Sequence, residues 1–334
     1  MKTFNERSVA ALFTAETIRD ILTTDTSHGE DDFREAIFAQ LDSGEKLVVK
    51  VAANAFTAAE HIRIWQRCAD EYRKLGYYCP RIFAALDGTF PLISYKGRDC
   101  IAYAEEFAKY APASQCSNVR PFREALYRMT AKVAQERFDY TASPSGYCLF
   151  EVFPGEEMDE VTENAIAFRD FCRTLPESFH EQAERMFRRW EENREALRKV
   201  YFDLPFSVYQ ADFNDTNVLV DENGDFVGIF DFNLAGRDEI LNYLFREIYQ
   251  GSLDEERKEI LKALRVVSEI YSFSEAEIQA APLIYRCLKP LWYSRVETLK
   301  FFGSDYVKIQ ACLDEMENAQ VREIDFRNSM QRQN

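Results

Sequence analysis

Short apolar runs separated by turn residues fill the first part of the chain, and this pattern predicts β-strands. The run at residues 46–51 is apolar and β-branched, as expected of a central strand. Asp42-Ser43-Gly44 predicts the turn that precedes this run. The predicted strands are residues 17–24, 33–41, 46–51, 79–85 and 100–107.

Helical periodicity takes over later in the chain. One helix is predicted among the strands, at residues 57–75, with Gly76 as its stop signal. Beyond about residue 110 helices dominate, and Ser252 and Glu255 have the spacing of a capping box. Pro290 should break the last helix. The predicted helices of this part are residues 121–138, 161–175, 178–201, 253–271 and 276–300.

Strands in one block and helices in another predict an α+β chain rather than a doubly wound sheet. The 334 residues suffice for about two structural units. We place the boundary after residue 107, which gives a small β-rich N-terminal lobe (1–107) and a larger, mostly helical C-terminal lobe (108–334). Only 12 Gly and 10 Pro are present, so we expect no long flexible linker.

The composition is that of a globular protein with free thiols. Apolar residues make up 46% of the chain and aromatic residues 14%, which is enough to pack a core. The eight cysteines form no C-x-x-C pair and only three histidines are present, which argues against a zinc site. The absence of a signal-peptide pattern and of a membrane-spanning apolar run predicts a cytoplasmic protein.

The net charge narrows the class of partner. The chain has 41 basic and 57 acidic residues, a formal charge of −16. Such a field repels nucleic acid and anionic membranes, so we expect neither as a partner, and it mildly favours cationic small molecules. The acidity also fits a role in solubility alone, and both explanations stay open at this point.

A short hairpin interrupts the helical part at residues 207–233. Two apolar strands, 218–221 and 226–230, flank Asn223-Gly224. Asn-Gly between apolar strands is the strongest short-range hairpin signal.

The hairpin brings polar side chains to one end. A two-residue turn sets Asn217 opposite Phe230, whereas a three-residue loop sets Asn217 opposite Asp231. In either register Asn217 and Asp231 lie at the same end, beside the loop that carries Asp212.

An Asp, an amide and a second Asp at one hairpin mouth have a chemical use. Two oxygen donors can hold Mg²⁺, which takes few protein ligands and completes its shell with substrate phosphates. The remaining carboxylate can accept a proton from an attacking hydroxyl, the division of labour that phosphoryl transfer needs. The competing interpretation is that Asp212 and Asn217 only cap turns.

The spacing Asp212-x-x-x-x-Asn217, followed by the hairpin and Ile-Phe-Asp231-Phe, resembles the H-G-D-x-x-x-x-N and I-D-F/W signature of the aminoglycoside phosphotransferase and choline kinase group, which is related to the catalytic loop and D-F-G of protein kinases. The resemblance implies a two-lobed protein-kinase-like fold, with Asp212 as catalytic base and Asn217 and Asp231 as Mg²⁺ ligands. Gln210 and Ala211 depart from the pattern, since they stand in place of the usual His and Gly.

The resemblance also assigns roles in the N-terminal lobe. Lys50, on the strand before the predicted helix, would bind the α- and β-phosphates of the nucleotide. A glutamate from that helix, Glu60 or Glu71, would hold Lys50. Glu60 has a competing explanation, because Thr57-Ala-Ala-Glu60 also fits a capping box.

Two further segments match this arrangement. The strand at residues 100–107 resembles the one that leads into the inter-lobe hinge, where adenine would bond to backbone groups of Glu106, Phe107 and Ala108. The loop around Gly29 lies where a phosphate-covering loop would be, although an ordinary turn explains it equally well. Neither a Walker A motif nor a G-x-G-x-x-G fingerprint is present.

We therefore expect an enzyme, a small-molecule kinase that uses ATP or GTP and Mg²⁺. Its acceptor would be a small-molecule hydroxyl, as in an aminoglycoside, choline or another amino alcohol, or a sugar. The alternative is a nucleotide-binding pseudokinase acting as sensor or scaffold, which Gln210-Ala211 would explain. A protein-substrate kinase fits less well, because no Ala-Pro-Glu follows Asp231 and Asn233 replaces the D-F-G glycine.

Overall fold

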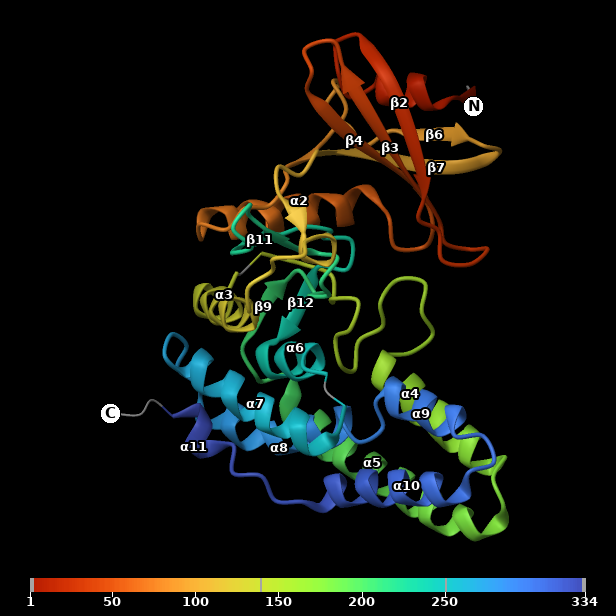
Figure 1. Cartoon of the computed structure of the whole chain (residues 1–334), viewed down its shortest axis with the longest axis vertical. Helices are drawn as coiled ribbons and strands as arrows, with labels where there is room; N and C mark the ends of the chain where they lie inside the picture. Colours follow the sequence, from red (N-terminus) through yellow and green to blue (C-terminus); the bar gives the residue numbers. More distant parts are fainter. Residues whose placement is uncertain (1–2, 139, 250, 332–334) are drawn as a thin grey trace. The chain divides into compact units, whose positions relative to one another are not determined.

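The computed structural model describes residues 3–138, 140–249 and 251–331. The chain divides into two compact units (Figure 1). The first comprises Met1–Pro121, Thr141–Ser143 and Gln210–Gly236, and the second Phe122–Tyr140, Pro144–Tyr209 and Arg237–Asn334. The hairpin segment thus packs with the N-terminal strands, although it follows them by a hundred residues. The boundary between the two lobes that we placed after residue 107 stays a prediction.

The first unit is built on a twisted sheet with strand order β1-β6-β7-β4-β3-β2, and β5 also pairs with β7. The strands expected at residues 17–24, 33–41, 46–51 and 100–107 are confirmed, whereas the one expected at 79–85 shrinks to two residues. The strands are β1 (Thr3–Phe4), β2 (Ile18–Asp25), β3 (Phe33–Leu41), β4 (Lys46–Ala53), β5 (Ile82–Phe83), β6 (Leu92–Tyr95) and β7 (Arg98–Glu106).

Alternation along the central strands gives the sheet two different faces. One face carries the apolar core, with Ile37, Val49 and Ala102 buried together beneath α1 (Glu6–Ala10). Lys50 lies on the opposite face, where it pairs with Tyr103 of the neighbouring strand β7. The strand therefore presents a lysine on one side without interrupting the core on the other.

Helix α2 (Ala59–Lys74) follows β4. Its N-cap is Ala58, which makes no side-chain cap bond, so the capping box predicted for Thr57 and Glu60 is wrong. The Thr57 backbone N–H instead donates to Asn54 Oδ1 at 2.8 Å. Asn54, at the start of the loop after β4, thus takes the Thr57 N–H that the Glu60 side chain would accept in a capping box.

The predicted hairpin is present as β10 (Val218–Val220) and β11 (Phe226–Ile229), and β8 (Ala111–Pro112) extends it to three strands. The turn is a three-residue loop, because Asp221 N–H donates to Asp225 O at 2.9 Å. A register shift between Leu219 and Val220 then restores the pairing of Val218 with Ile229. Asn217 consequently lies opposite Phe230, the position expected for the shorter turn.

Gly228 on β11 is required by a close backbone approach. A Cβ at this position would lie 1.8 Å from the carbonyl oxygen of Tyr78. We expect Gly228→Ala to lower the free energy of unfolding by about 2–4 kcal/mol, because the backbone must shift to relieve the overlap. Denaturant unfolding measures the change.

Gly44→Ala is the matched control for this substitution. Gly44 has φ +87° with open space around it. Its replacement costs only the backbone strain of a left-handed residue, about 1–2 kcal/mol. Equal losses in the two variants would contradict the steric explanation.

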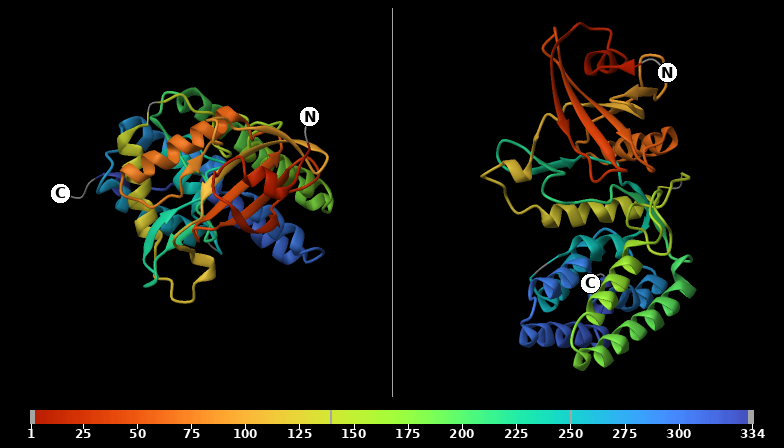
Figure 2. Two further views of the ribbon diagram at one scale, coloured as in Figure 1. Left: turned by 90° about the horizontal axis from the view of Figure 1, so that it is seen from above. Right: turned by 90° about the vertical axis from the view of Figure 1, so that its right-hand side faces the viewer.

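The second unit is mostly helical, and α5 packs against α4, α8 and α10 (Figure 2). The expected break near Pro290 is confirmed, because α8 ends at Leu288 and α9 begins at Tyr293. Ser252 caps α7 by accepting from Glu255 N–H. The helices are α3 (Arg123–Glu136), α4 (Glu160–Arg173), α5 (His180–Tyr201), α6 (Ile240–Glu247), α7 (Leu253–Ser268), α8 (Glu275–Leu288), α9 (Tyr293–Phe301), α10 (Tyr306–Val321) and α11 (Arg327–Met330).

Short elements complete the second unit. β9 (Phe206–Tyr209) pairs with β12 (Gly236–Glu239), and these strands lead into and out of the hairpin segment. Within the described ranges, no helix has the length and apolar character needed to cross a membrane.

Candidate active site

Asp212 and Asn217 lie in the loop that connects β9 with β10, within the first unit. Asn217 Nδ2 donates to Asp212 Oδ2 at 3.0 Å. Asn214 Nδ2 donates to both carboxylate oxygens of Asp212 at 2.9 Å. The two amides fix the orientation of the carboxylate, and the structure thus brings together two of the residues predicted from sequence.

Asp231 lies at the same end of the hairpin. Phe230 N–H donates to Asn217 O at 3.0 Å, which places Asn217 beside the residue that precedes Asp231. Asp231 itself has φ +59°, in the left-handed region. Aspartate tolerates this conformation better than most residues, so the turn can aim its carboxylate away from the strand.

Gln210 joins these two parts of the site. Its Nε2 donates to the carbonyl oxygens of Phe230 at 3.0 Å and Asp231 at 2.7 Å. Its Oε1 accepts from Asp212 N–H at 2.8 Å. The side chain is fully buried, so these three bonds form away from water. One amide therefore sets the backbone positions of both Asp212 and Asp231.

Lys50 reaches the site from β4. Its Nζ lies 3.0 Å from Asp231 Oδ1 and 3.1 Å from Glu105 Oε1. The register explains the second contact, because Glu105 lies opposite Val48 and so is a diagonal neighbour of Lys50 on the same sheet face. Lys50, Asp231 and Glu105 form one charged cluster.

The expected partner of Lys50 was a glutamate of α2, and here the structure differs. Glu60 is exposed in the first turn of that helix. Glu71 forms an ion pair with Lys74 at 3.0 Å. Glu105 takes the place beside Lys50 because the β4–β7 pairing fixes it there. A contribution of Glu60 or Glu71 to nucleotide binding stays a prediction.

Burial and charge act against each other in this cluster. Burial lowers the pKa of Lys50, but the carboxylates of Asp231 and Glu105 more than offset this and raise it well above its usual value. Burial raises the pKa of Glu105, and the ammonium group of Lys50 opposes that rise. Lys50 therefore carries its charge at neutral pH and is available to an anionic ligand.

The predicted hinge residues lie at the end of β7, whose last residue is Glu106. The Glu106 side chain accepts from Arg81 N–H at 3.1 Å, and its own N–H donates to Arg81 O at 2.9 Å. The Phe107 ring packs edge-on against Phe38, with Lys46 Nζ 4.7 Å from its centroid. Ala108 is half-buried.

A cavity of about 500 Å³ opens beside Phe107 on the β2–β3–β4 part of the sheet. Its size is that of a small-molecule site. Its lining comes from three strands and the hinge: Asp20, Ile21, Leu22, Thr24, Phe38, Ala39, Gln40, Lys46 and Phe107.

The donor set at the hairpin mouth fits Mg²⁺. Asn217 donates through Nδ2 to Asp212, its Oδ1 accepts a long bond of 3.5 Å from Thr216 Oγ1 that a cation could displace, and Asp231 adds a carboxylate. Mg²⁺ typically takes only one or two such protein ligands together with phosphate oxygens. In the described part of the chain, no group of three or more His, Cys, Asp or Glu side chains could hold a metal ion. A two-ligand site that depends on nucleotide is consistent with that finding.

Sequence reasoning gave no role to Gln210, Glu105 or Asn214. Gln210 follows the apolar run Ser207-Val-Tyr, and a polar residue at the end of a buried strand is the signal that could have singled it out. Glu105 was visible only as part of a strand. Its contact with Lys50 depends on pairing between strands fifty residues apart.

A comparison with protein-family models matches residues 30–242 to the phosphotransferase enzyme family. The match begins just before β3 and includes α2, the hairpin and the start of α6. A comparison with curated proteins found no match.

Solved structures share the fold at low sequence identity. An aminoglycoside phosphotransferase from Alicyclobacillus acidocaldarius subsp. acidocaldarius aligns with TM-score 0.55 and 15% identity, covering 97% of this chain and 96% of the other. An amicoumacin kinase, solved with AMP-PNP, Ca²⁺ and Ami, aligns with TM-score 0.56 and 13% identity over 96% and 94%. A microcompartment-associated aminopropanol kinase gives 0.55 and 10% over 94% of each chain. The predicted kinase-like α+β fold is thereby confirmed.

Proposed function

Because the chain belongs to the phosphotransferase enzyme family, we propose that it transfers the γ-phosphoryl group of ATP to a hydroxyl of a small molecule. The observation that carries this proposal is one connected set of polar contacts at the hairpin mouth. Asn217 bonds to Asp212, Gln210 bonds to the backbone of both Asp212 and Asp231, and Lys50 bonds to Asp231.

Asp212 would act as the general base. Its carboxylate accepts the proton of the acceptor hydroxyl as that oxygen forms a bond to the γ-phosphorus. The bond between the γ-phosphorus and the β–γ bridging oxygen breaks, and ADP leaves with the electron pair. Asn214 and Asn217 keep the carboxylate in one orientation throughout, because they hold both of its oxygens.

Lys50 would bind the phosphates of the nucleotide, and Asn217 and Asp231 would hold Mg²⁺. When bound, Mg²⁺ would neutralise charge that develops on the phosphates. Asp231 and Glu105 keep Lys50 charged and in place before nucleotide arrives. The backbone of Glu106, Phe107 and Ala108, beside the cavity at Phe107, would receive the adenine.

The acceptor we propose is a hydroxyl compound that carries an amine. The charge of −16 favours a cationic ligand. Two of the structurally similar proteins are an aminoglycoside phosphotransferase and an aminopropanol kinase. We place the protein in the cytoplasm, since the cysteines are free thiols and most are buried.

The test is ADP release from Mg²⁺-ATP over a panel of aminoglycosides, amino alcohols and neutral sugars. We expect turnover only with a subset of the amine-bearing acceptors, and no such turnover in Asp212→Asn. Turnover with neutral sugars alone would overturn the proposed acceptor class. Turnover that persists in the variant would overturn the role of Asp212.

The pseudokinase alternative rests on Gln210 and Ala211, and the contacts give Gln210 a use in an active site. Gln210→Leu keeps the volume but removes all three bonds. It should lower the free energy of unfolding by about 2–4 kcal/mol, because two carbonyls and one N–H lose their partners. Turnover should fall at least about tenfold, because Asp212 and Asp231 lose their alignment.

Gln210→His is the companion variant. A neutral imidazole offers one donor and one acceptor, so it can replace part of the amide's bonding. We expect it to rank between the native protein and Gln210→Leu in both stability and turnover. If Gln210→Leu matched the native protein in turnover, Gln210 would not position the site.

A further inference from the structure

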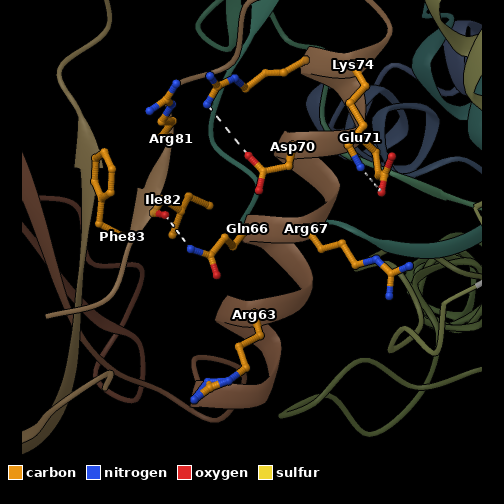
Figure 3. Close-up of a pocket in the computed structure, with 10 residues that line it drawn as sticks. Arg63, Gln66, Arg67, Asp70, Glu71, Lys74, Arg81, Ile82 and Phe83 are labelled. Carbon is orange, nitrogen blue, oxygen red and sulfur yellow. Dashed lines mark hydrogen bonds and ion pairs between the residues drawn. The ribbon is translucent and has the colours of Figure 1, made fainter. Parts of the chain in front are cut away.

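A second cavity, of about 830 Å³, lies in the first unit between α2 and the segment that carries β5 (Figure 3). Arg63, Gln66 and Asp70 extend from the helix on the side facing Ile82, and Arg81 faces them from the other wall. We call this cavity the α2 groove. Its lining is Arg63, Gln66, Arg67, Asp70, Glu71, Arg73, Lys74, Arg81, Ile82 and Phe83.

The α2 groove is basic on an acidic protein. Five of its ten lining residues are Arg or Lys and two are acidic, whereas the whole chain has 41 basic against 57 acidic residues. Four of the five cations are arginines. Guanidinium groups bind phosphate and carboxylate with two parallel hydrogen bonds, which a lysine cannot do. The groove therefore has the chemistry of an oxyanion site.

The two carboxylates neutralise only part of this charge, because each lies beside one of the five cations. Asp70 lies 3.8 Å from Arg73, and Glu71 pairs with Lys74. The Arg63 guanidinium lies 5.3 Å from the centroid of the Phe90 ring, a contact that leaves its N–H groups available to a ligand.

Arg81 completes the set from the opposite wall. It is exposed, and its nearest carboxylate oxygen, on Glu106, is 3.8 Å away. A contact this long and this open to water contributes little. The guanidinium can turn toward an anion in the groove at small cost.

The opposite side of α2 contacts the proposed active site. Trp65 is buried and packs against Tyr103, the residue across from Lys50. The Tyr72 hydroxyl accepts from Gln210 N–H at 3.3 Å, and the Tyr72 ring packs edge-on against Phe232. A displacement of α2 would thus move groups next to both aspartates.

A hydrogen bond also links α2 to the opposite wall of the groove. Gln66 Nε2 donates to Ile82 O at 2.8 Å, which links α2 to β5. An anion bound between α2 and the segment that carries β5 would strengthen this link, because it would bridge the same two walls.

We propose that the α2 groove binds a small polyanion with two or more phosphate groups, and that its occupancy changes the rate of phosphoryl transfer. A compact polyanion suits the groove better than an acidic peptide, because cations of α2 and Arg81 of the opposite wall line a volume typical of small-molecule sites. The binding step is independent of the proposed function. The rate effect rests on the proposed function.

The test uses inorganic tripolyphosphate as the probe, titrated calorimetrically into the full chain. We expect the double variant Arg63→Ala/Arg81→Ala to bind the probe at least about tenfold more weakly than the native protein. The control Arg19→Ala/Arg188→Ala removes two exposed arginines outside the groove with the same change in net charge, and should leave affinity unchanged. Thermal melting checks that both variants are folded.

Equal binding by the native protein and the groove variant would place the probe elsewhere and overturn the proposal. Groove-dependent binding of polyglutamate but not tripolyphosphate would overturn it in favour of an acidic protein partner. For the rate effect, tripolyphosphate should change the KM for ATP or kcat by at least about twofold in the native protein and not in the groove variant. Groove-dependent binding with an unchanged rate would overturn regulation alone, and absence of turnover without probe would count against the proposed function instead.

Discussion

Replacing Asp212 by asparagine is expected to lower kcat by about 10²–10⁴-fold while leaving the affinity for Mg²⁺-ATP nearly unchanged. The amide cannot accept the proton of the acceptor hydroxyl, so base catalysis is lost. Nucleotide binding should survive, because the Asp212 N–H still donates to Gln210 and neither Lys50 nor Asp231 is altered. Steady-state ADP release gives kcat, and titration calorimetry gives the nucleotide affinity.

Asp215→Asn is the matched control for this substitution. Asp215 is exposed in the same loop, and its replacement makes the same change of charge. Its backbone oxygen accepts from Ser114 N–H, a contact that the side-chain change preserves. We expect kcat within about twofold of the native value, as for a surface position. A comparable loss in both variants would mean that loop charge rather than a base at residue 212 supports the reaction.

Local sequence signals predicted the parts of this site that depend on neighbouring residues. The Asn-Gly hairpin brought Asn217 and the segment of Asp231 to one end in either register, so the prediction did not depend on the turn length, which the sequence left open. Most of the longer strands and helices were also predictable, because each repeats its pattern over several turns or pleats. α10 (Tyr306–Val321) was not predicted at its observed bounds. Strands of two to four residues, such as β9 and β12, carry too little periodicity to be seen.

Contacts between distant segments could not be predicted in this way. The pairing of Lys50 with Glu105 follows from the β4–β7 register, which no local pattern encodes. Two of the bonds of Gln210 join a loop to a strand end about twenty residues later, where a comparison with the family signature showed only a missing histidine. The cap expected at Thr57 failed because Asn54, outside the capping-box spacing, competes for the same backbone.

The same dependence on distant contacts explains why the two aspartates should respond differently to mutation. Asp212 is held by the amides of its own loop, Asn214 and Asn217. The Asp231 carboxylate pairs with Lys50 from the distant strand β4, and the Asp231 carbonyl accepts a hydrogen bond from Gln210. Changes at Asp212 should therefore affect chemistry, and changes at Asp231 should affect the binding of charged ligands.

We expect Asp231→Asn to weaken the binding of Mg²⁺-ATP by at least about 100-fold. Loss of a group that only supports a metal ligand typically lowers metal affinity by about 10–100-fold, and loss of the ligand itself should exceed that. Asparagine tolerates the left-handed backbone at this position, which isolates the loss of charge from backbone strain. The bond from Gln210 to the carbonyl of residue 231 also remains. Calorimetric titration with ATP, in Mg²⁺ and in EDTA, measures the effect.

The dependence on Mg²⁺ is what distinguishes a metal ligand from a partner of Lys50. If Asp231 holds Mg²⁺, the native protein should bind ATP more tightly in Mg²⁺ than in EDTA, and the variant should bind similarly in both. If Asp231 only neutralises Lys50, its removal frees an ammonium group for the phosphates, and ATP affinity in EDTA should rise. Asp225→Asn, an exposed hairpin residue that pairs with Arg120, serves as control and should keep the native Mg²⁺ dependence. Unchanged Mg²⁺-ATP affinity in Asp231→Asn would remove the metal role of Asp231, and it would leave Asp212 as the carboxylate beside Asn217.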